Sequence, residues 1–213
     1  MAKAKEVTVE IPAIKTMTML VKIVGDTPLI CHAFSQKAKT QMLDKQQLKA
    51  KQGRKAKDPE RDFLDGLHSM DKKPIADAKH IPPCGFPARG FKAAMVRAAQ
   101  DAGLKMVDAR RFFHVIGDLV EIKGAKWFMR EDTVKIGQGT TDLRYRPETT
   151  EWWAELTIKY NVGVVSKEQI VNLINLAGFG VGVGEMRPCG KQSSGCNGMF
   201  HVELNGQIKK GKK

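Results

Sequence analysis

The sequence predicts an α+β fold in which two helices cover one face of an antiparallel sheet. Two segments, Thr16 to Val24 and Glu151 to Tyr160, alternate apolar and polar residues as half-buried strands do. Two others, Pro87 to Ala102 and Ser166 to Ala177, carry apolar residues at helical spacing. These strand and helix patterns alternate along 213 residues, which is enough chain to bury one sizeable core.

The first elements are strands. Val7 to Ile11 is predicted as a short edge strand, and Thr16 to Val24 as a longer one. Asp26-Thr27-Pro28 ends the longer strand, because this sequence favours a turn. His32 follows, and Ser35 suits the N-cap of a helix that begins after it.

A basic segment at about 36–75 interrupts the alternation and is predicted to be a helical insertion. Lys37 to Lys57 holds eight Lys and Arg residues against the single Asp44. Asp58-Pro59-Glu60 opens a second short helical run, Arg61 to Met70. A solvated surface is the ordinary explanation of such a charge run. The alternative is an arm that clamps a polyanionic strand, through Lys49, Lys51, Arg54 and Lys55.

The middle of the chain returns to core elements. A rigid turn from His80 leads to Pro87, whose missing N–H costs nothing at the start of a helix. Phe112 to Ile122 is predicted as one strand. A β-hairpin arm follows at about 125–146, with Gly137-Gln138-Gly139 as its turn. Trp152 and Trp153 point to opposite faces of the next strand, so one of them belongs to the core.

The last helix and the last strand flank a glycine-rich loop. Ser166 and Gln169 are spaced as a capping box, and Gly178 stands where a C-cap belongs. Gly178 to Gly184 has four alternate glycines. They either pack against another segment or let a sugar-phosphate backbone come close. The sequence lacks the Gly-Lys-Ser/Thr of a Walker loop, and a helix precedes the glycines, which is the wrong order for a Rossmann site.

The predicted order of core elements is β, insertion, α, β, hairpin, β, α, β, with Gly198 to Leu204 as the final strand. This is the order of a ferredoxin-like split βαβ sandwich that carries a basic helical insertion and a β-hairpin arm. We expect residues 1–213 to form a single domain with flexible basic tails, whose lysines are Lys3, Lys5, Lys209, Lys210, Lys212 and Lys213.

Two pieces of the chain resemble the RAMP superfamily of CRISPR-associated RNA-binding proteins. One is Gly178 to Gly184 followed by Gly198-Met199-Phe200. The other is the turn Ile81-Pro82-Pro83 that leads to Gly90-Phe91 and Arg97. The resemblance implies a ferredoxin-like domain, RNA binding, and an insertion that corresponds to the thumb of subunits lined up along a guide RNA. Nearly the whole chain also looks like uncharacterised proteins encoded by tailed phages.

Composition points to a polyanionic partner. The chain has 36 Lys and Arg against 23 Asp and Glu, a net charge of +13. Four cysteines and no signal-peptide pattern favour free thiols in a cytoplasm, that of the bacterial host if the protein is phage-encoded. No apolar run reaches the roughly 18 residues of a membrane span, so we expect a soluble protein.

Other candidate sites are few. The gap between Cys189 and Cys196 is too wide for a zinc knuckle, so no metal and no cofactor are predicted. His32 is the candidate general base if RNA is cleaved, because it follows the first strand. Arg144-Tyr145-Arg146 sets an aromatic between two charges, as a base-stacking site or an exposed β-arm would.

These observations predict a non-catalytic protein that binds single-stranded RNA or DNA through its phosphates and forms a homo-oligomer along the strand. Gly180, Gly182 and Gly184 would approach the backbone. The phosphates would be neutralised by Arg187, Lys191, Arg89, Lys92, Arg144 and Arg146. Two alternatives stay open: a phage assembly protein whose basic arm contacts other subunits or packaged DNA, and a metal-independent RAMP-type endoribonuclease.

Overall fold

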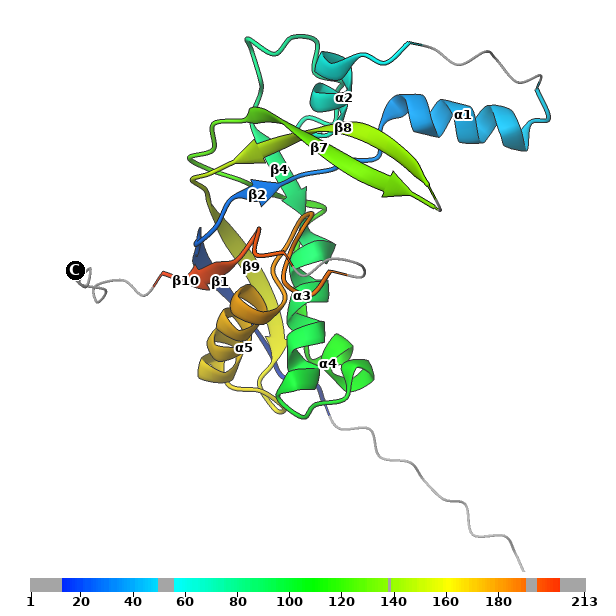
Figure 1. Cartoon of the computed structure of the whole chain (residues 1–213). Helices are drawn as coiled ribbons and strands as arrows, with labels where there is room; N and C mark the ends of the chain where they lie inside the picture. The colour runs from blue at the N-terminus through cyan, green and yellow to red at the C-terminus, as the bar shows by residue number, and fades with distance from the viewer. Residues whose placement is uncertain (1–12, 50–55, 138, 191–194, 204–213) are drawn as a thin grey trace, which may run out of the picture.

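A computed structural model describes residues 13–49, 56–137, 139–190 and 195–203, and it confirms an α+β fold (Figure 1). The edge strand expected at Val7 to Ile11 lies outside these residues. The helices and strands, in chain order, are β1 (Thr16–Gly25), β2 (Leu29–Ile30), α1 (Gln36–Gln46), α2 (Pro59–Asp65), β3 (His68–Ser69), β4 (Cys84–Pro87), α3 (Ala88–Asp101), α4 (Met106–Phe112), β5 (Phe113–Val115), β6 (Leu119–Glu121), β7 (Phe128–Ile136), β8 (Thr140–Thr149), β9 (Trp153–Asn161), α5 (Lys167–Gly180) and β10 (Phe200–Val202).

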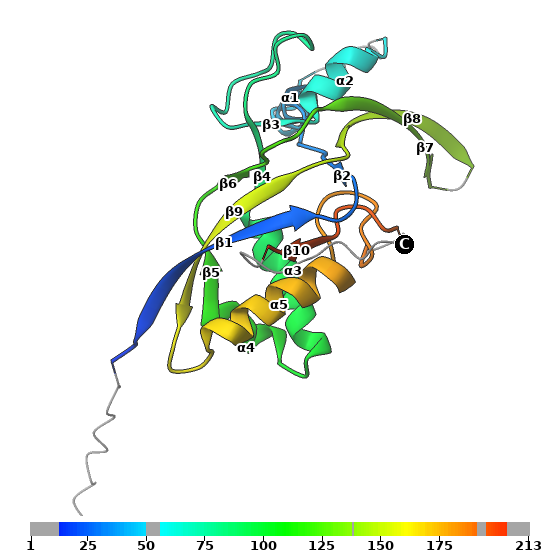
Figure 2. The ribbon, with the colours of Figure 1, turned by 90° about the vertical axis from the view of Figure 1, so that its left-hand side faces the viewer.

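The central sheet has four strands in the order β10-β1-β9-β5, and each neighbouring pair is antiparallel. The longest pairing in this sheet is between β1 and β9, in which Ile23 lies opposite Ala154. Both α3 and α5 lie on one side of this sheet, where they contact each other (Figure 2). The predicted antiparallel sheet with two helices on one face is therefore present.

The core lies between this sheet and the two helices, and alternation along the strands places it there. Ala154, Leu156, Ile158 and Tyr160 of β9 are buried, as the sequence pattern predicts. On β1, only Val21 and Ile23 are buried, because the helices do not cover the start of the strand, and Met17 is exposed. From the helix side the core receives Phe91, Ala94, Met95, Ile170, Ile174 and Ala177.

The two neighbouring tryptophans separate as predicted. Trp152 is buried, and its indole Nε1 donates to the carbonyl oxygen of Thr27 at 2.9 Å. Trp153 lies half-buried on the open face of the sheet, with the ammonium groups of Lys22 and Lys123 over its ring at 4.6 and 4.9 Å from the centroid. One tryptophan thus serves the core and the other covers the opposite face.

Two smaller sheets stand above the central one, β2-β8-β7 and β3-β4-β6. The predicted hairpin is present as β7 and β8, which turn at Gly137 and Gly139, both with positive φ. It runs three residues beyond the expected end, to Thr149, because β8 also pairs with β2. Figure 1 shows α2 lying against this hairpin, with which it makes contacts.

The insertion contains α1, α2 and β3. Ser35 caps α1 as expected, since its hydroxyl accepts from the backbone N–H of Ala38 at 3.1 Å. Every described residue of α1 is exposed or half-exposed, including Met42 and Leu43. The second helix ends at Asp65 and not near Met70, because Gly66 closes it and the chain then pairs as β3.

The single strand predicted over Phe112 to Ile122 is wrong. The structure divides it into β5, which joins the central sheet, and β6, which pairs with β4. Gly117 separates the two with φ +110°, a conformation that breaks a strand. A short helix, α4, also precedes β5 where the sequence pattern predicted none. Within the described residues, no helix is both long and apolar enough to cross a bilayer.

Candidate nucleic-acid interface

The glycine-rich segment begins inside a helix. The capping box of Ser166 and Gln169 is confirmed, but α5 continues to Gly180, so the expected C-cap at Gly178 is wrong. Gly178 is buried against β10, and a Cβ there would lie 1.7 Å from the carbonyl oxygen of Phe200. Its role is therefore close packing of the helix on the sheet.

The next glycines differ in what they touch. Gly182 and Gly184 have φ +67° and +80°, which glycine adopts without strain. A Cβ on Gly184 would lie 2.4 Å from the carbonyl oxygen of Ile30 in β2, to which Glu185 also donates its N–H. Gly180 has no atom within 4 Å of its Cβ position. Gly182 and Gly184 thus shape the loop, whereas Gly180 faces open space.

The loop forms one wall of a groove that consists of two adjoining cavities, called here the basic groove. The larger cavity has about 840 Å³ and lies between the insertion and the start of α3. The smaller has about 510 Å³ and lies between α3 and the loop. Phe86, Gly184 and Arg187 line both, so the two cavities meet at the N-terminal end of α3.

Positive charge dominates the larger cavity. Six Lys and Arg residues and three carboxylates line it. Two carboxylates are paired, Asp65 with Arg61 and Asp118 with Lys72. Four cations make no ion pair with any described residue, and they are Lys39, Lys73, Arg89 and Arg187.

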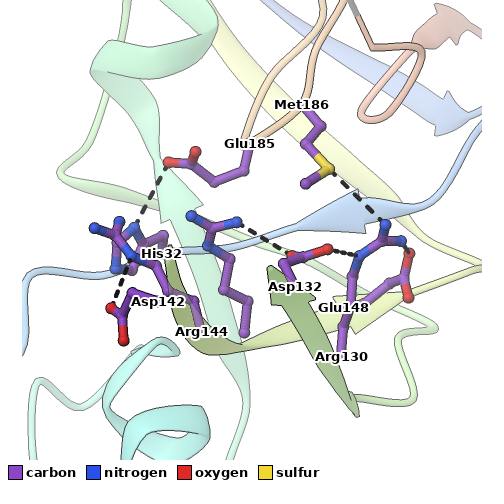
Figure 3. A network of polar contacts seen from close by, with 9 residues as sticks. His32, Arg130, Asp132, Asp142, Arg144, Glu148, Glu185 and Met186 are labelled. Carbon is purple, nitrogen blue, oxygen red and sulfur yellow. Dashed lines mark hydrogen bonds and ion pairs between the residues drawn. The ribbon is translucent and has the colours of Figure 1, made fainter. Parts of the chain in front are cut away.

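Two histidines line the larger cavity. Nδ1 of His32 lies 3.7 Å from Oε1 of Glu185, the third carboxylate (Figure 3). This contact is the main cause that lowers the pKa of Glu185, so the carboxylate stays charged. Burial lowers the pKa of His68, and the positive charge of Arg89 lowers it further. The imidazole of His68 is therefore neutral at pH 7.

Of the other basic residues predicted to bind phosphates, Arg187 lies in the groove, and the remaining ones lie elsewhere or outside the described residues. Arg187 lines the groove, and its Nη1 donates to the carbonyl oxygen of Gly184 at 2.8 Å. Lys92 lines neither cavity, and its Nζ lies 2.9 Å from Nδ1 of His114. Lys49, three residues after the end of α1, pairs with Asp44. Lys51, Arg54, Lys55 and Lys191 lie outside the described residues.

Arg144 and Arg146 both belong to the hairpin but have different surroundings. Arg144 is half-exposed and lies 3.8 Å from Asp142 (Figure 3). Arg146 is 5% exposed, and its Nη1 donates to Asp132, which is 7% exposed, at 3.1 Å. Its Nε has no hydrogen-bond partner among the described residues. The expectation that Arg146 neutralises a phosphate does not fit this burial.

Asp132 lies at the centre of a polar network beneath the loop. Arg130 donates to Asp132 at 2.8 Å and to Glu148 at 2.9 Å (Figure 3). Nη2 of Arg130 also lies 3.9 Å from the sulfur of Met186 in the loop. Figure 3 shows Glu185 and Met186 above the hairpin residues. The network therefore ties the hairpin to the wall of the groove.

The described residues contain no group of three or more His, Cys, Asp or Glu that could hold a metal ion. Cys31 and Cys84 are buried, and burial raises the pKa of both thiols, that of Cys84 to about 11. Both thiols are therefore protonated at pH 7. Cys189 is half-exposed and Cys196 is exposed, and both are free.

Several groove residues were not singled out from the sequence. Lys39, Lys73, His68 and Phe86 come from four different segments, and only the tertiary structure brings them to one cavity. In the sequence, the adjacent pair Lys72-Lys73 before Pro74 is the feature that could have pointed to Lys73 as a groove residue. Lysine pairs are common on solvated surfaces, so the signal is not specific.

Comparison with known proteins assigns the chain to no family. No protein-family model matches the chain, and no curated protein sequence matches it at a significant level. The chemistry of the basic groove is therefore what bears on function.

Proposed function

We propose that this chain binds single-stranded RNA or DNA in the basic groove, mainly through phosphates. The observation that carries the proposal is the meeting of the two cavities beside Arg187. Together they offer a continuous path along which Lys39, Lys73 and Arg89 keep their charges unpaired among the described residues. A flexible polyanion fits such a path better than a compact ligand does.

The backbone at the junction adds positive potential. Pro87 is the N-cap of α3, and no side chain caps this helix end. The N–H of Ala88 donates to the carbonyl oxygen of Asp118 at 2.9 Å, and the next N–H groups at this helix end carry partial positive charge, which attracts phosphate. Pro87 and Arg89 line the larger cavity and Gly90 lines the smaller one, so the helix end lies where the two cavities meet. The net charge of +13 acts in the same direction at longer range.

The proposal also covers the fold family to which the central sheet and its two helices belong. We infer that β1, α3, β5, β9, α5 and β10 form a ferredoxin-like split βαβ unit of RAMP type. The strand order β10-β1-β9-β5 supports it, as does the position of α3 between β1 and β5 and of α5 between β9 and β10. On this reading the chain is a phage-type nucleic-acid-binding protein that oligomerises along the strand in the host cytoplasm.

Binding through phosphates predicts a steep salt dependence. For a mixed-sequence single strand, the log–log slope of affinity against salt should be about 0.7 per phosphate contact. Arg89→Gln should weaken binding about fivefold at moderate salt, the effect of a contact of about 1 kcal/mol. It should also lower the salt slope by about 0.7, because one contact is lost. Fluorescence anisotropy titrations at several salt concentrations measure both quantities.

Arg110→Gln is the matched control. Arg110 is exposed on α4 and lines neither cavity, so the same change of charge should leave affinity and slope unaltered. Equal losses in both variants would mean that net charge, and not the groove, attracts the strand. No binding by the wild type at low salt would refute the proposal and favour a phage assembly protein, which should sediment as a multimer without nucleic acid.

We expect binding without cleavage. The wild type should leave a labelled RNA intact in the presence of a chelator. His32→Ala should bind the same RNA within about twofold of the wild type, because His32 is held by Glu185 and is not needed as a general base. Denaturing gels and anisotropy provide the two measurements. Cleavage by the wild type that His32→Ala abolishes, with binding intact, would instead identify an endoribonuclease.

A further inference from the structure

The smaller cavity of the groove, called here the small-residue pocket, differs in chemistry from the larger one. Its lining combines glycines and alanines with three larger apolar side chains, and among the described residues no carboxylate lines it. Two charged side chains line it in the part of the chain that the structure describes, Arg97 and Arg187. The lining residues that matter here are Phe86, Gly90, Ala93, Val181, Gly182 and Val183.

We propose that the small-residue pocket receives one nucleobase of the bound strand, an inference that rests on the proposed function. A volume of about 510 Å³ is within the range of small-molecule sites. Apolar walls suit the faces of a base, because an apolar surface costs far less to desolvate than a charged phosphate does. Arg97 and Arg187 can hold the phosphates on either side of the inserted base.

The hydrogen bonds of the backbone around the pocket determine how selective the pocket is among the four bases. Most N–H groups of the loop residues that line the pocket donate within the protein: among them, Val183 donates to Gly198, Cys189 to Val181 and Gly190 to Arg187. Few polar groups remain to bond the edge of a base. The pocket therefore recognises a base by shape and apolar contact, so the chain should accept all four bases with similar affinity.

Ala93 offers a way to fill the pocket without disturbing the core. It is exposed on α3 and lines the pocket, so Ala93→Trp places an indole where the base would lie. Ala102→Trp is the matched control, because Ala102 is exposed at the C-cap of the same helix and lines neither cavity. Circular dichroism and thermal melts establish that each variant is folded. If Ala93→Trp does not fold, Ala93→Leu takes its place.

The experiment compares an oligothymidylate with an abasic oligodeoxynucleotide of the same length. Both carry the same phosphates, so phosphate contacts alone give equal affinities. We expect the wild type and Ala102→Trp to bind the oligothymidylate about tenfold more tightly, the lower end of what a buried base contributes. Ala93→Trp should lose this tenfold preference and still bind the abasic strand with the wild-type salt slope.

The outcomes separate this inference from the proposed function. Equal affinity of the wild type for the two strands would overturn the base pocket and leave phosphate binding in place. An equal loss for both strands in Ala93→Trp would mean that the indole blocks the backbone path, which also overturns it. Failure of the wild type to bind either strand would refute the proposed function itself.

Discussion

Gly178→Ala is expected to lower the free energy of unfolding by about 3 kcal/mol or more. The added Cβ would lie 1.7 Å from the carbonyl oxygen of Phe200 and 2.7 Å from its carbonyl carbon. These atoms belong to β10, whose backbone is held by its pairing with β1, so the contact cannot be relieved by a side-chain rotation. The helix must move away from the sheet, which opens the core around Phe91 and Phe200. Urea denaturation followed by circular dichroism measures the change.

Gly180→Ala is the matched control for this prediction. Gly180 lies two residues further along the same helix, has no atom within 4 Å of its Cβ position, and has no positive φ. Alanine there should leave stability unchanged or raise it by up to about 1 kcal/mol, because the unfolded chain loses freedom. Similar destabilisation by both substitutions would show that glycine is needed along this stretch for a reason other than packing against β10.

Asp132→Ala is expected to cost about 3–5 kcal/mol, the usual cost of leaving a buried charge without its partner. Asp132 accepts from Arg146 and from Arg130, and it is the only carboxylate among the described residues within 4.0 Å of Arg146. Arg146 already has one N–H without a partner. Its guanidinium would then be buried with no anion, so either the hairpin separates from the loop or the domain unfolds. A combined change, Asp132→Ala with Arg146→Met, should recover part of the loss, since it removes the buried charge.

Asp142→Ala serves as the control on the same hairpin. Asp142 pairs with Lys57 and Arg144 at the surface, where water screens the charges, so its removal should change stability far less. Thermal melts of the two alanine variants compare a buried carboxylate on β7 with a solvated one on the paired strand β8. Equal effects would show that the Asp132–Arg146 pair is no more important than a surface pair.

Periodicity predicted the long helices and strands, because burial of one face requires apolar residues at regular spacing along the sequence. Thr16–Gly25 and Trp153–Asn161 are the two central strands, and their alternation is visible because one face packs on the helices. The shorter strands β2, β3 and β4 have two to four residues, too few for any period. The division of Phe112 to Ile122 depended on the backbone angle at Gly117, which alternating apolar residues on both sides concealed.

The candidate interface was predicted less well than the fold, for a physical reason. The glycines of the loop were correctly identified as a place of close approach, but three of the four approach the protein's own backbone or side chains. Spacing alone cannot tell whether the neighbour of a glycine is a strand of the same chain or a ligand. The sequence shows only the charge of Arg146 and its place on the hairpin, and the burial of Asp132 beside it reveals a structural pair.

The exposure of α1 has a consequence for affinity. A helix of 11 residues with no buried side chain among those described gains little from tertiary packing, and helices of this length are marginal in water. We therefore expect it to exchange with coil on the microsecond scale while the rest of the chain stays folded. Lys39 of this helix lines the basic groove, so under the proposed function the apparent affinity for a strand would be reduced by the fraction of molecules in which the helix is unwound. Helix propensity at the exposed positions of α1 thus becomes a means of adjusting affinity that leaves the melting temperature of the domain unchanged.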